Sequence, residues 1–413
     1  MKVLFLSQIV PYPPHGGVLQ RGFNIVREVA NRHELHLLAF VHRDILKTPE
    51  EVEHSRRVLG SFCESVEYFD LWPKRSQLDK LLAIGAGLAL PEPFSVIAHR
   101  SPAFGRRIRD IVQERGIDVI HYDTIALARF MGSAPGLPSV LTHHNIESQL
   151  MDRRAAVERW PASAYLSMQT RKLLAYEASM SPRFDVNVMM SDVDASALRK
   201  IAPGVETAVV PNGVDVDYFV PGNEPEEPAM IYTGGMNMFA NRDAVMHFVD
   251  HIWPLVKAAR PDARFDIVGQ DPQPELLERA RADSGLRVHG YLDDVRPLVR
   301  KAAVYVVPIR VGGGTRLKVL DALAQGKAIV STAVGCEGIQ VTHDKDILIE
   351  DDPQAFARLV VSLLNDPERR RSLGDRGRDL AVSRYAWGPI GGRLITAYED
   401  AIRRHQGRSE RAA

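Results

Sequence analysis

The residues best suited to chemistry form a glycine loop followed by two cations. Residues 312–318 read GGGTRLK and include Gly313, Gly314, Thr315, Arg316 and Lys318. Glycines let the backbone approach a ligand closely, and a helix that starts after them directs unpaired N–H groups toward it. A hydroxyl and two positive side chains add to those donors, so the pattern predicts a site for a phosphorylated ligand. The alternative is an ordinary glycine-rich turn in an α/β sheet.

The elements around this loop are expected to form a βαβ unit. A buried, β-branched strand is predicted over residues 304–309, directly before the glycines. Apolar residues then recur at helical spacing from Leu317 to Ala324, and Gly326 ends that helix. A second strand is predicted over residues 328–331, which completes the unit.

A second glycine loop follows the first expected strand, Lys2–Ser7. It is rich in proline and ends in Gly16 and Gly17, before an amphipathic helix expected from Val18 to Ala30. Open α/β sheets bind ligands at the carboxyl ends of their strands, so we interpret this segment as a ligand loop. A structural turn is the alternative. The loop lacks G-x-G-x-x-G, so it carries no dinucleotide fingerprint.

Polar side chains end two further expected strands in the first half of the chain. One strand, from Ile117, ends in His121-Tyr122-Asp123, and the next, from Ser139, ends in His143-His144-Asn145. Polar groups at the ends of successive strands are expected around a cleft. A single histidine is more often structural, but recurrence at two strand ends favours a functional set.

The chain is long enough for two domains, since its 413 residues exceed what one hydrophobic core usually holds. A proline-rich, acidic linker is predicted at residues 221–228, and strands alternate with helices on both sides of it. Alternating strands and crossover helices imply parallel sheets, so we expect an α/β protein with two doubly wound domains facing a common cleft.

Composition excludes several classes of protein. The formal net charge is +0, which argues against a nucleic-acid partner, because such proteins normally show a basic excess. Cys63 and Cys336 lie far apart without metal-ligand spacing, as expected of reduced cytosolic thiols. The first strand is too short for a signal peptide.

One apolar run raises the question of a membrane. Residues 81–90 read LLAIGAGLAL, which is too short to span a bilayer. Arg106, Arg107 and Arg109 follow nearby, and cations beside apolar residues suit contact with an anionic membrane surface. The alternative is an apolar helix packed in the core beside solvated arginines.

The motifs, taken in order, carry a family resemblance over nearly the whole chain. Residues 209–215 (VVPNGVD), followed by Tyr218-Phe219, and the segment Gly314–Gly326 resemble group 1 (family 4) glycosyltransferases of the GT-B fold. The resemblance implies a retaining glycosyltransferase of hexosyltransferase type, acting on a nucleotide diphosphate sugar. It implies an acceptor-binding domain over residues 1–215, joined by a final helix crossing back over about 388–413, and a donor-binding domain over residues 216–387.

This sequence departs from the family pattern at the E-x7-E motif. Asp321 stands at the second acid and Gly313 at the first, so the ribose contact is kept while the usual sugar contact is lost. The family's Arg and Lys after the first strand of the second domain are replaced by Gly235 and Ala240. The GGGTRLK loop therefore resembles a variant site in which Arg316 and Lys318 supply the positive charge.

The resemblance also implies a role for each further residue. The base of the nucleotide would contact the backbone at Tyr291 and Leu292, and the Gly16-Gly17 backbone would approach the leaving phosphate. The family's catalytic-cleft histidine normally sits in an H-x-H pattern, where Asp123 takes the second place, and His144 is another candidate. Arg316 and Lys318 would stabilise the leaving diphosphate.

The resemblance completes a set of expectations about partners and location. We expect a nucleotide-sugar donor, a glycan or lipid-linked acceptor, no metal and no other cofactor, and a cytoplasmic protein at the inner face of the membrane that serves cell-surface polysaccharide biosynthesis. Three alternatives remain: a GT-B epimerase or hydrolase acting on nucleotide sugars, a two-domain dehydrogenase, and a catalytically silent nucleotide-binding scaffold.

Overall fold

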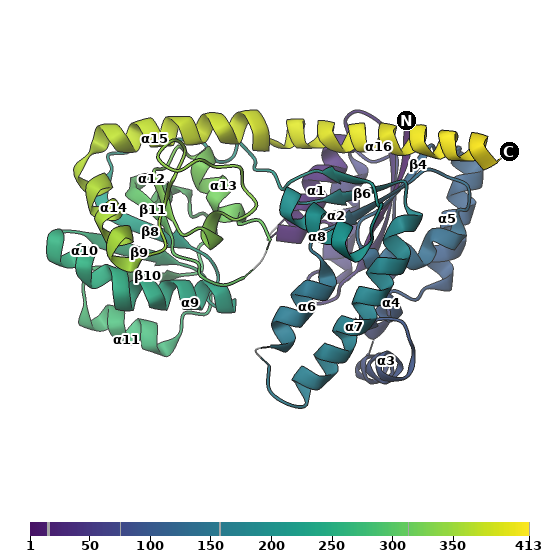
Figure 1. The fold of residues 1–413 in the computed structure, drawn as a ribbon, viewed down its shortest axis with the longest axis horizontal. Helices are drawn as coiled ribbons and strands as arrows, with labels where there is room; N and C mark the ends of the chain where they lie inside the picture. Colours follow the sequence, from purple (N-terminus) through teal and green to yellow (C-terminus); the bar gives the residue numbers. More distant parts are fainter. Residues whose placement is uncertain (15–16, 75, 157, 313, 413) are drawn as a thin grey trace. The chain divides into compact units, whose positions relative to one another are not determined.

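The chain forms two compact units. The computed structural model describes residues 1–14, 17–74, 76–156, 158–312 and 314–412. Unit 1 comprises Met1–Pro211 and Ile390–Ala413, and unit 2 comprises Asn212–Pro389 (Figure 1). Each unit contains one parallel sheet covered by helices, so the expected pair of doubly wound Rossmann-like domains is confirmed.

Unit 1 contains a seven-stranded sheet in the order β3-β2-β1-β4-β5-β6-β7. The strand order reverses between β1 and β4, and such a switch point places ligands at the carboxyl ends of the strands. The strands are β1 (Lys2–Ser7), β2 (Glu34–Val41), β3 (Ser65–Asp70), β4 (Val119–Tyr122), β5 (Ser139–His143), β6 (Val186–Met189) and β7 (Thr207–Val209). The helices are α1 (Gly17–Ala30), α2 (Pro49–Gly60), α3 (Gln77–Ala89), α4 (Phe94–Ala98), α5 (Pro102–Arg115), α6 (Glu147–Ala155), α7 (Ala162–Met180) and α8 (Asp192–Ile201).

Unit 2 contains a six-stranded sheet in the order β10-β9-β8-β11-β12-β13, with its switch point between β8 and β11. The strands are β8 (Glu227–Thr233), β9 (Arg264–Val268), β10 (Leu286–Gly290), β11 (Ala302–Val307), β12 (Ile329–Ser331) and β13 (Leu348–Ile349). The helices are α9 (Phe239–His247), α10 (Trp253–Ala259), α11 (Pro274–Ala282), α12 (Arg296–Lys301), α13 (Leu317–Ala324), α14 (Pro353–Asn365) and α15 (Pro367–Leu380).

The last helix, α16 (Trp387–Ala412), leaves unit 2 and belongs to unit 1 from Ile390 onward. Its Tyr398 is fully buried there and hydrogen-bonds to His121 of β4. The expected return of the final helix to the first domain is therefore confirmed.

The two cores follow from the sequence pattern of their strands. Strands β1 and β11 are continuous apolar runs with helices on both faces, as in buried parallel sheets. Strand β3 was not expected, because it is an edge strand with half-buried residues and lacks such a run. The strand expected over residues 304–309 ends at Val307, before Pro308, which has no N–H to donate to a sheet.

Candidate functional site

Lys318 places a cation at the carboxyl edge of the sheet in unit 2. The residue lies in the first turn of α13, and its Nζ donates to the Tyr232 hydroxyl at 2.7 Å and to Asn241 Oδ1 at 2.9 Å. Both acceptors are neutral, and the ammonium also lies 4.0 Å from the centre of the Tyr232 ring. The Tyr232 hydroxyl in turn donates to Asn241 Oδ1 at 2.6 Å. The cation is thus held in place without a carboxylate at either hydrogen bond.

The missing side chain of Gly234 makes room for this ammonium. A Cβ at Gly234 would lie 2.4 Å from Lys318 Nζ and 2.9 Å from Asn241 Nδ2. Gly234 directly follows β8, the strand after which the family usually carries its Arg and Lys. A cation from α13 therefore reaches the end of β8 because the residue there is glycine.

Asp321 lies one helical turn after Lys318, and burial affects both groups. Burial raises the pKa of Asp321 to about 7, although the positive charge of Lys318 opposes the shift. Burial lowers the pKa of Lys318 to about 7, and the charge of Arg316 adds to that shift. Within the described part of the chain, Asp321 Oδ1 is buried without a hydrogen-bond partner. That oxygen is available to a hydroxyl of a ligand.

Gly314, Thr315 and Arg316 of the glycine loop directly precede α13. Arg316 Nη1 donates to the carbonyl oxygen of Gly314 at 2.8 Å, which folds the loop onto the start of α13. The hydroxyl oxygen of Thr315 is buried and has no partner among the described residues. We call Tyr232, Asn241, Arg316, Lys318 and Asp321 the unit 2 cluster. Gly313, the predicted replacement of the family's first acid, lies outside the described residues.

Tyr291 and Leu292 follow β10 at the same edge of the sheet. The Tyr291 side chain is 66% exposed, and Leu292 packs against the core of unit 2. An exposed aromatic ring at the carboxyl edge offers a flat surface to a base, in addition to the backbone contact that the resemblance implies.

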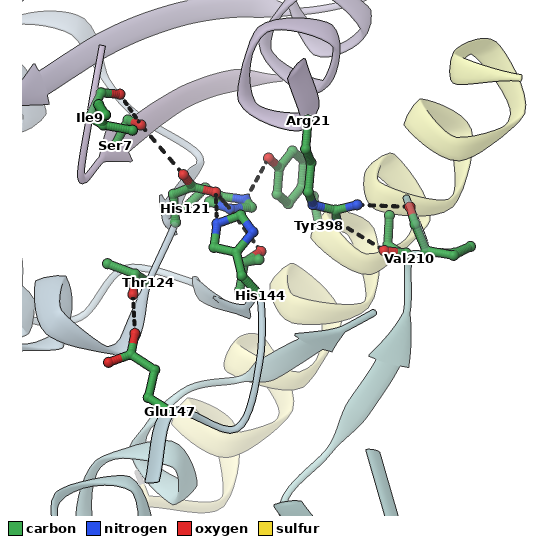
Figure 2. Close-up of polar contacts among 12 residues, drawn as sticks. Ser7, Ile9, Arg21, His121, Thr124, His144, Glu147, Val210 and Tyr398 are labelled. Atoms are coloured by element: carbon green, nitrogen blue, oxygen red, sulfur yellow. Dashed lines mark hydrogen bonds and ion pairs between the residues drawn. The ribbon is translucent and has the colours of Figure 1, made fainter. Parts of the chain in front are cut away.

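Asp123 and His144, predicted from two different strand ends, meet in unit 1. Figure 2 labels His144 among its polar neighbours. His144 Nε2 lies 3.2 Å from Asp123 Oδ1, and Ser7 donates to Asp123 Oδ2 at 3.4 Å. Burial alone would raise the pKa of Asp123, but the nearby His144, His121 and Arg21 lower it below its ordinary value. The pair is thus a buried carboxylate beside an imidazole.

His121 plays a structural part in this region. Its Nδ1 hydrogen-bonds to the Tyr398 hydroxyl at 2.8 Å and its Nε2 to Thr142 Oγ1 at 3.0 Å, while its ring stacks on Phe5. Burial lowers its pKa to about 3, so the ring stays neutral. A histidine with both nitrogens bonded ties α16 to the sheet.

Glu147, the first residue of α6, brings a second carboxylate near His144. Its Oε1 accepts a hydrogen bond from Thr124 Oγ1 at 2.8 Å, as Figure 2 shows. Burial raises its pKa, while Thr124 and His144 lower it less. The residue is only partly buried. We call Ser7, Asp123, Thr124, His144 and Glu147 the unit 1 cluster.

Arg21 of α1 lies behind the unit 1 cluster and is 3% exposed. Its guanidinium donates to the carbonyl oxygens of Pro211 at 2.7 Å and Val210 at 2.9 Å, the last residues of unit 1 before the chain enters unit 2. Burial lowers its pKa to about 10, against the opposing charge of Asp123. Gly17, predicted as part of the ligand loop, is the exposed first residue of the same helix, and Gly16 lies outside the described residues.

Several of these residues were missed in the sequence. Arg21 left a signal, because a charged residue stands among the apolar positions of α1, with Ile25 and Val29 on the same buried face. Tyr232, Asn241 and Glu147 left none, because each acquires its role through a partner far away in the chain.

The described residues contain neither a metal-ligand cluster nor a helix suited to span a membrane. Within ranges 1–14, 17–74, 76–156, 158–312 and 314–412, no group of three or more His, Cys, Asp or Glu is placed to hold a metal ion. No described helix combines the length and apolar character needed to cross a membrane.

The fold has a counterpart among solved structures. Anabaena HepE in complex with UDP superposes with a TM-score of 0.68 at 15% identity, over 97% of this chain and 100% of that one. Two parallel-sheet units and a last helix that returns from the second unit to the first give this chain the GT-B fold.

Sequence comparison assigns the family within that class. The profile of Glycosyltransferase Family 4 matches residues 15–218, and that of Glycosyl transferases group 1 matches residues 227–366. The chain belongs to the group 1 glycosyltransferases and is an enzyme of that family.

Its curated relatives are similar at low identity. A phosphatidyl-myo-inositol mannosyltransferase of Mycobacterium tuberculosis is 26% identical over 335 residues, which cover 76% of this chain and 83% of the relative. A GDP-mannose-dependent monoacylated α-(1-6)-phosphatidylinositol monomannoside mannosyltransferase of Corynebacterium glutamicum is 27% identical over 214 residues. That match covers 47% of this chain and only 56% of the relative, so the chain spans about half its length.

Proposed function

We propose that this glycosyltransferase moves a hexose, with retention, from a nucleotide diphosphate sugar to a hydroxyl of a glycan or lipid-linked acceptor in cell-surface polysaccharide biosynthesis. The observation that carries the donor half is Lys318, a partly buried cation whose two hydrogen-bond acceptors are neutral. Desolvating such a charge is costly, and a bound anion offsets that cost.

Each part of the donor has a candidate partner in unit 2. The diphosphate would lie over the backbone N–H groups of Gly314 and Thr315, beside Arg316 and Lys318. The ribose hydroxyls would donate to Asp321, whose Oδ1 accepts no hydrogen bond from the described residues. The base would lie at Tyr291 and Leu292, where the Tyr291 ring is exposed.

The chemistry follows from these charges. The bond between the anomeric carbon and the leaving phosphate oxygen breaks, and the acceptor oxygen bonds to the same face of that carbon. The acceptor proton passes to the leaving diphosphate. Lys318 and Arg316 stabilise the negative charge that develops on the diphosphate, so we propose that the reaction needs no metal or other cofactor.

The acceptor half rests on unit 1. Asp123 and His144 would hold the acceptor hydroxyl, since a carboxylate accepts its hydrogen bond and an imidazole orients it. The names of the curated relatives support a lipid-linked acceptor. We therefore propose a cytoplasmic enzyme in peripheral contact with the inner face of the membrane.

The test combines binding with turnover. In a thermal-shift screen with UDP, GDP and their sugar conjugates, one nucleotide should raise the apparent stability, because a ligand that binds the folded state stabilises it by mass action. Arg316→Ala with Lys318→Ala should abolish that shift and the transfer while the protein stays folded. Normal turnover of the double variant would disprove the donor site.

Product analysis separates this proposal from the alternatives. An epimerase or hydrolase would change the donor without an acceptor, and a scaffold would release no nucleotide with either. No finding favours these alternatives, and the family assignment argues against a dehydrogenase.

A further inference from the structure

Helix α3 presents an apolar stripe to solvent. Leu78, Leu81, Leu82 and Leu88 are 66%, 66%, 53% and 55% exposed. Their spacing of three, four and ten residues from Leu78 places them on one side of the helix, together with exposed Gly85 and Ala89. The alternative of a core helix is wrong for these leucines, because small residues, Ala83 and Gly87, face the interior instead.

The helix is fixed in this orientation. Its N-cap, Ser76, accepts a hydrogen bond from the Asp79 N–H, and Trp72 donates to the Asp79 carboxylate. At the other end, Gln169 of α7 donates to the Gly87 carbonyl oxygen at 2.9 Å, and Lys172 donates to those of Gly87 and Leu90 at 2.8 and 2.6 Å. Both ends are held, so the helix cannot roll its leucines inward without losing these bonds.

The α6–α7 hairpin carries further exposed apolar side chains. Trp160, between the two helices, is 82% exposed, and Leu150 of α6 is 49% exposed. The start of α7 touches α3, since the Tyr165 hydroxyl lies 3.1 Å from the position of a Cβ on Gly87. In Figure 1, α3 and the hairpin project from the same side of unit 1.

Cations outnumber acids around this surface. Within residues 149–172 the acids are Asp152 and Glu158, whereas the cations are Arg153, Arg154, Arg159, Arg171 and Lys172. The whole chain is neutral, so the excess is local. The arginines that the sequence suggested are placed differently: Arg106, Arg107 and Arg109 lie on α5, where Arg107 forms ion pairs with Glu67 and Glu114.

We propose that the leucine stripe of α3 and Trp160 dock unit 1 on a phospholipid surface with anionic headgroups. With 13 residues, α3 is about 20 Å long and too short to span a bilayer, but it suits a helix lying in the plane of the surface. The leucines enter the acyl boundary, Trp160 lies at headgroup level, and the hairpin arginines contact the headgroup phosphates. A second copy of the chain fits less well, because a two-fold contact would bring the same cationic hairpins together.

This docking rests on the proposed function only for its purpose, which is to bring the enzyme to a membrane-borne acceptor. Its test therefore omits donor and acceptor. The full chain is sedimented with vesicles of phosphatidylcholine alone or mixed with phosphatidylglycerol. We expect binding to the mixed vesicles, and a loss of about tenfold or more in Leu78→Gln with Leu81→Gln and Leu82→Gln. Leu255→Gln, an exposed leucine of unit 2, is the matched control and should bind as the parent does.

A second variant separates charge from apolar contact. Arg153→Gln with Arg154→Gln should weaken binding to the mixed vesicles by about fivefold per arginine and make it less sensitive to salt. Nucleotide affinity should be unchanged in both variants. The vesicle-binding result can therefore be interpreted even if the transfer assay fails. The proposal is overturned if the parent does not bind the mixed vesicles, or if the leucine variant binds them as strongly as the parent. It is also overturned if light scattering shows that the parent is a dimer and the leucine variant a monomer.

Discussion

The unit 1 and unit 2 clusters lie at the carboxyl edges of two similar sheets, but the charged groups in them have different neighbours. In unit 1, Asp123 lies beside His144 and near Arg21, so its charge is compensated within the protein. In unit 2, Lys318 is held by a hydroxyl and an amide oxygen, and nearby Arg316 adds a like charge. The first arrangement suits a neutral hydroxyl. The second suits an anion, because neither hydrogen-bond acceptor of Lys318 carries a negative charge.

The largest effect is expected from removing the cation of unit 2. Lys318→Met keeps much of the side-chain length but loses the charge, so kcat/KM should fall by about a thousandfold and the thermal shift by the nucleotide diphosphate should disappear. Steady-state kinetics and calorimetry measure the two effects. A variant with parental nucleotide affinity would show that unit 2 does not receive the diphosphate through Lys318.

A smaller effect, on turnover and not on nucleotide affinity, is expected from removing the carboxylate of unit 1. Asp123→Asn keeps the shape but removes the charge beside His144, so transfer should fall by about a hundredfold at unchanged nucleotide affinity. His144→Gln serves as the companion variant and should show the same split between turnover and binding. If either variant weakens nucleotide binding as Lys318→Met does, the contrast between the clusters fails.

The sequence predicted those residues of the clusters that lie close together in the chain, and it missed contacts between distant residues. The glycine loop, Lys318 and Asp321 lie within one βαβ unit, so local spacing was enough to group them. Asp123 and His144 could be named because parallel strands end at one edge. The Lys318 contact with Tyr232 spans 86 residues and the His121 contact with Tyr398 spans 277, and no local pattern encodes either. The apolar run of α3 fits either a membrane contact or a core helix in the sequence, because hydropathy does not say which face of a helix meets water.

Gly234 offers a subtler way to disturb unit 2. In Gly234→Ala the new methyl group would lie 2.4 Å from Lys318 Nζ, the movable end of a long side chain, so the ammonium should be displaced. The backbone at φ +157° disfavours any side chain, so the variant should fold with reduced stability. We expect nucleotide affinity to fall by about tenfold, less than in Lys318→Met, because the charge stays nearby. Gly392→Ala in α16, where a Cβ meets nothing within 4 Å, is the control variant. Calorimetry should show that it binds the nucleotide with the affinity of the parent. Equal affinities for the two variants would mean that the position of the ammonium does not matter.

The smallest effect is the pH dependence of nucleotide binding, and its sign follows from two opposing groups. Free Lys318, with a pKa of about 7, loses its proton between about pH 6 and pH 8, and a diphosphate prefers the protonated form, so affinity should fall over this range. Asp321, with a pKa of about 7, ionises over the same range and then accepts ribose hydroxyls better, so its contribution rises. The net change should be a few-fold fall, below the roughly tenfold limit for one proton per pH unit. Asp321→Asn removes the opposing contribution and should steepen the fall. Calorimetry at several pH values measures both slopes, and identical slopes in the parent and in Asp321→Asn would show that Asp321 does not titrate with binding.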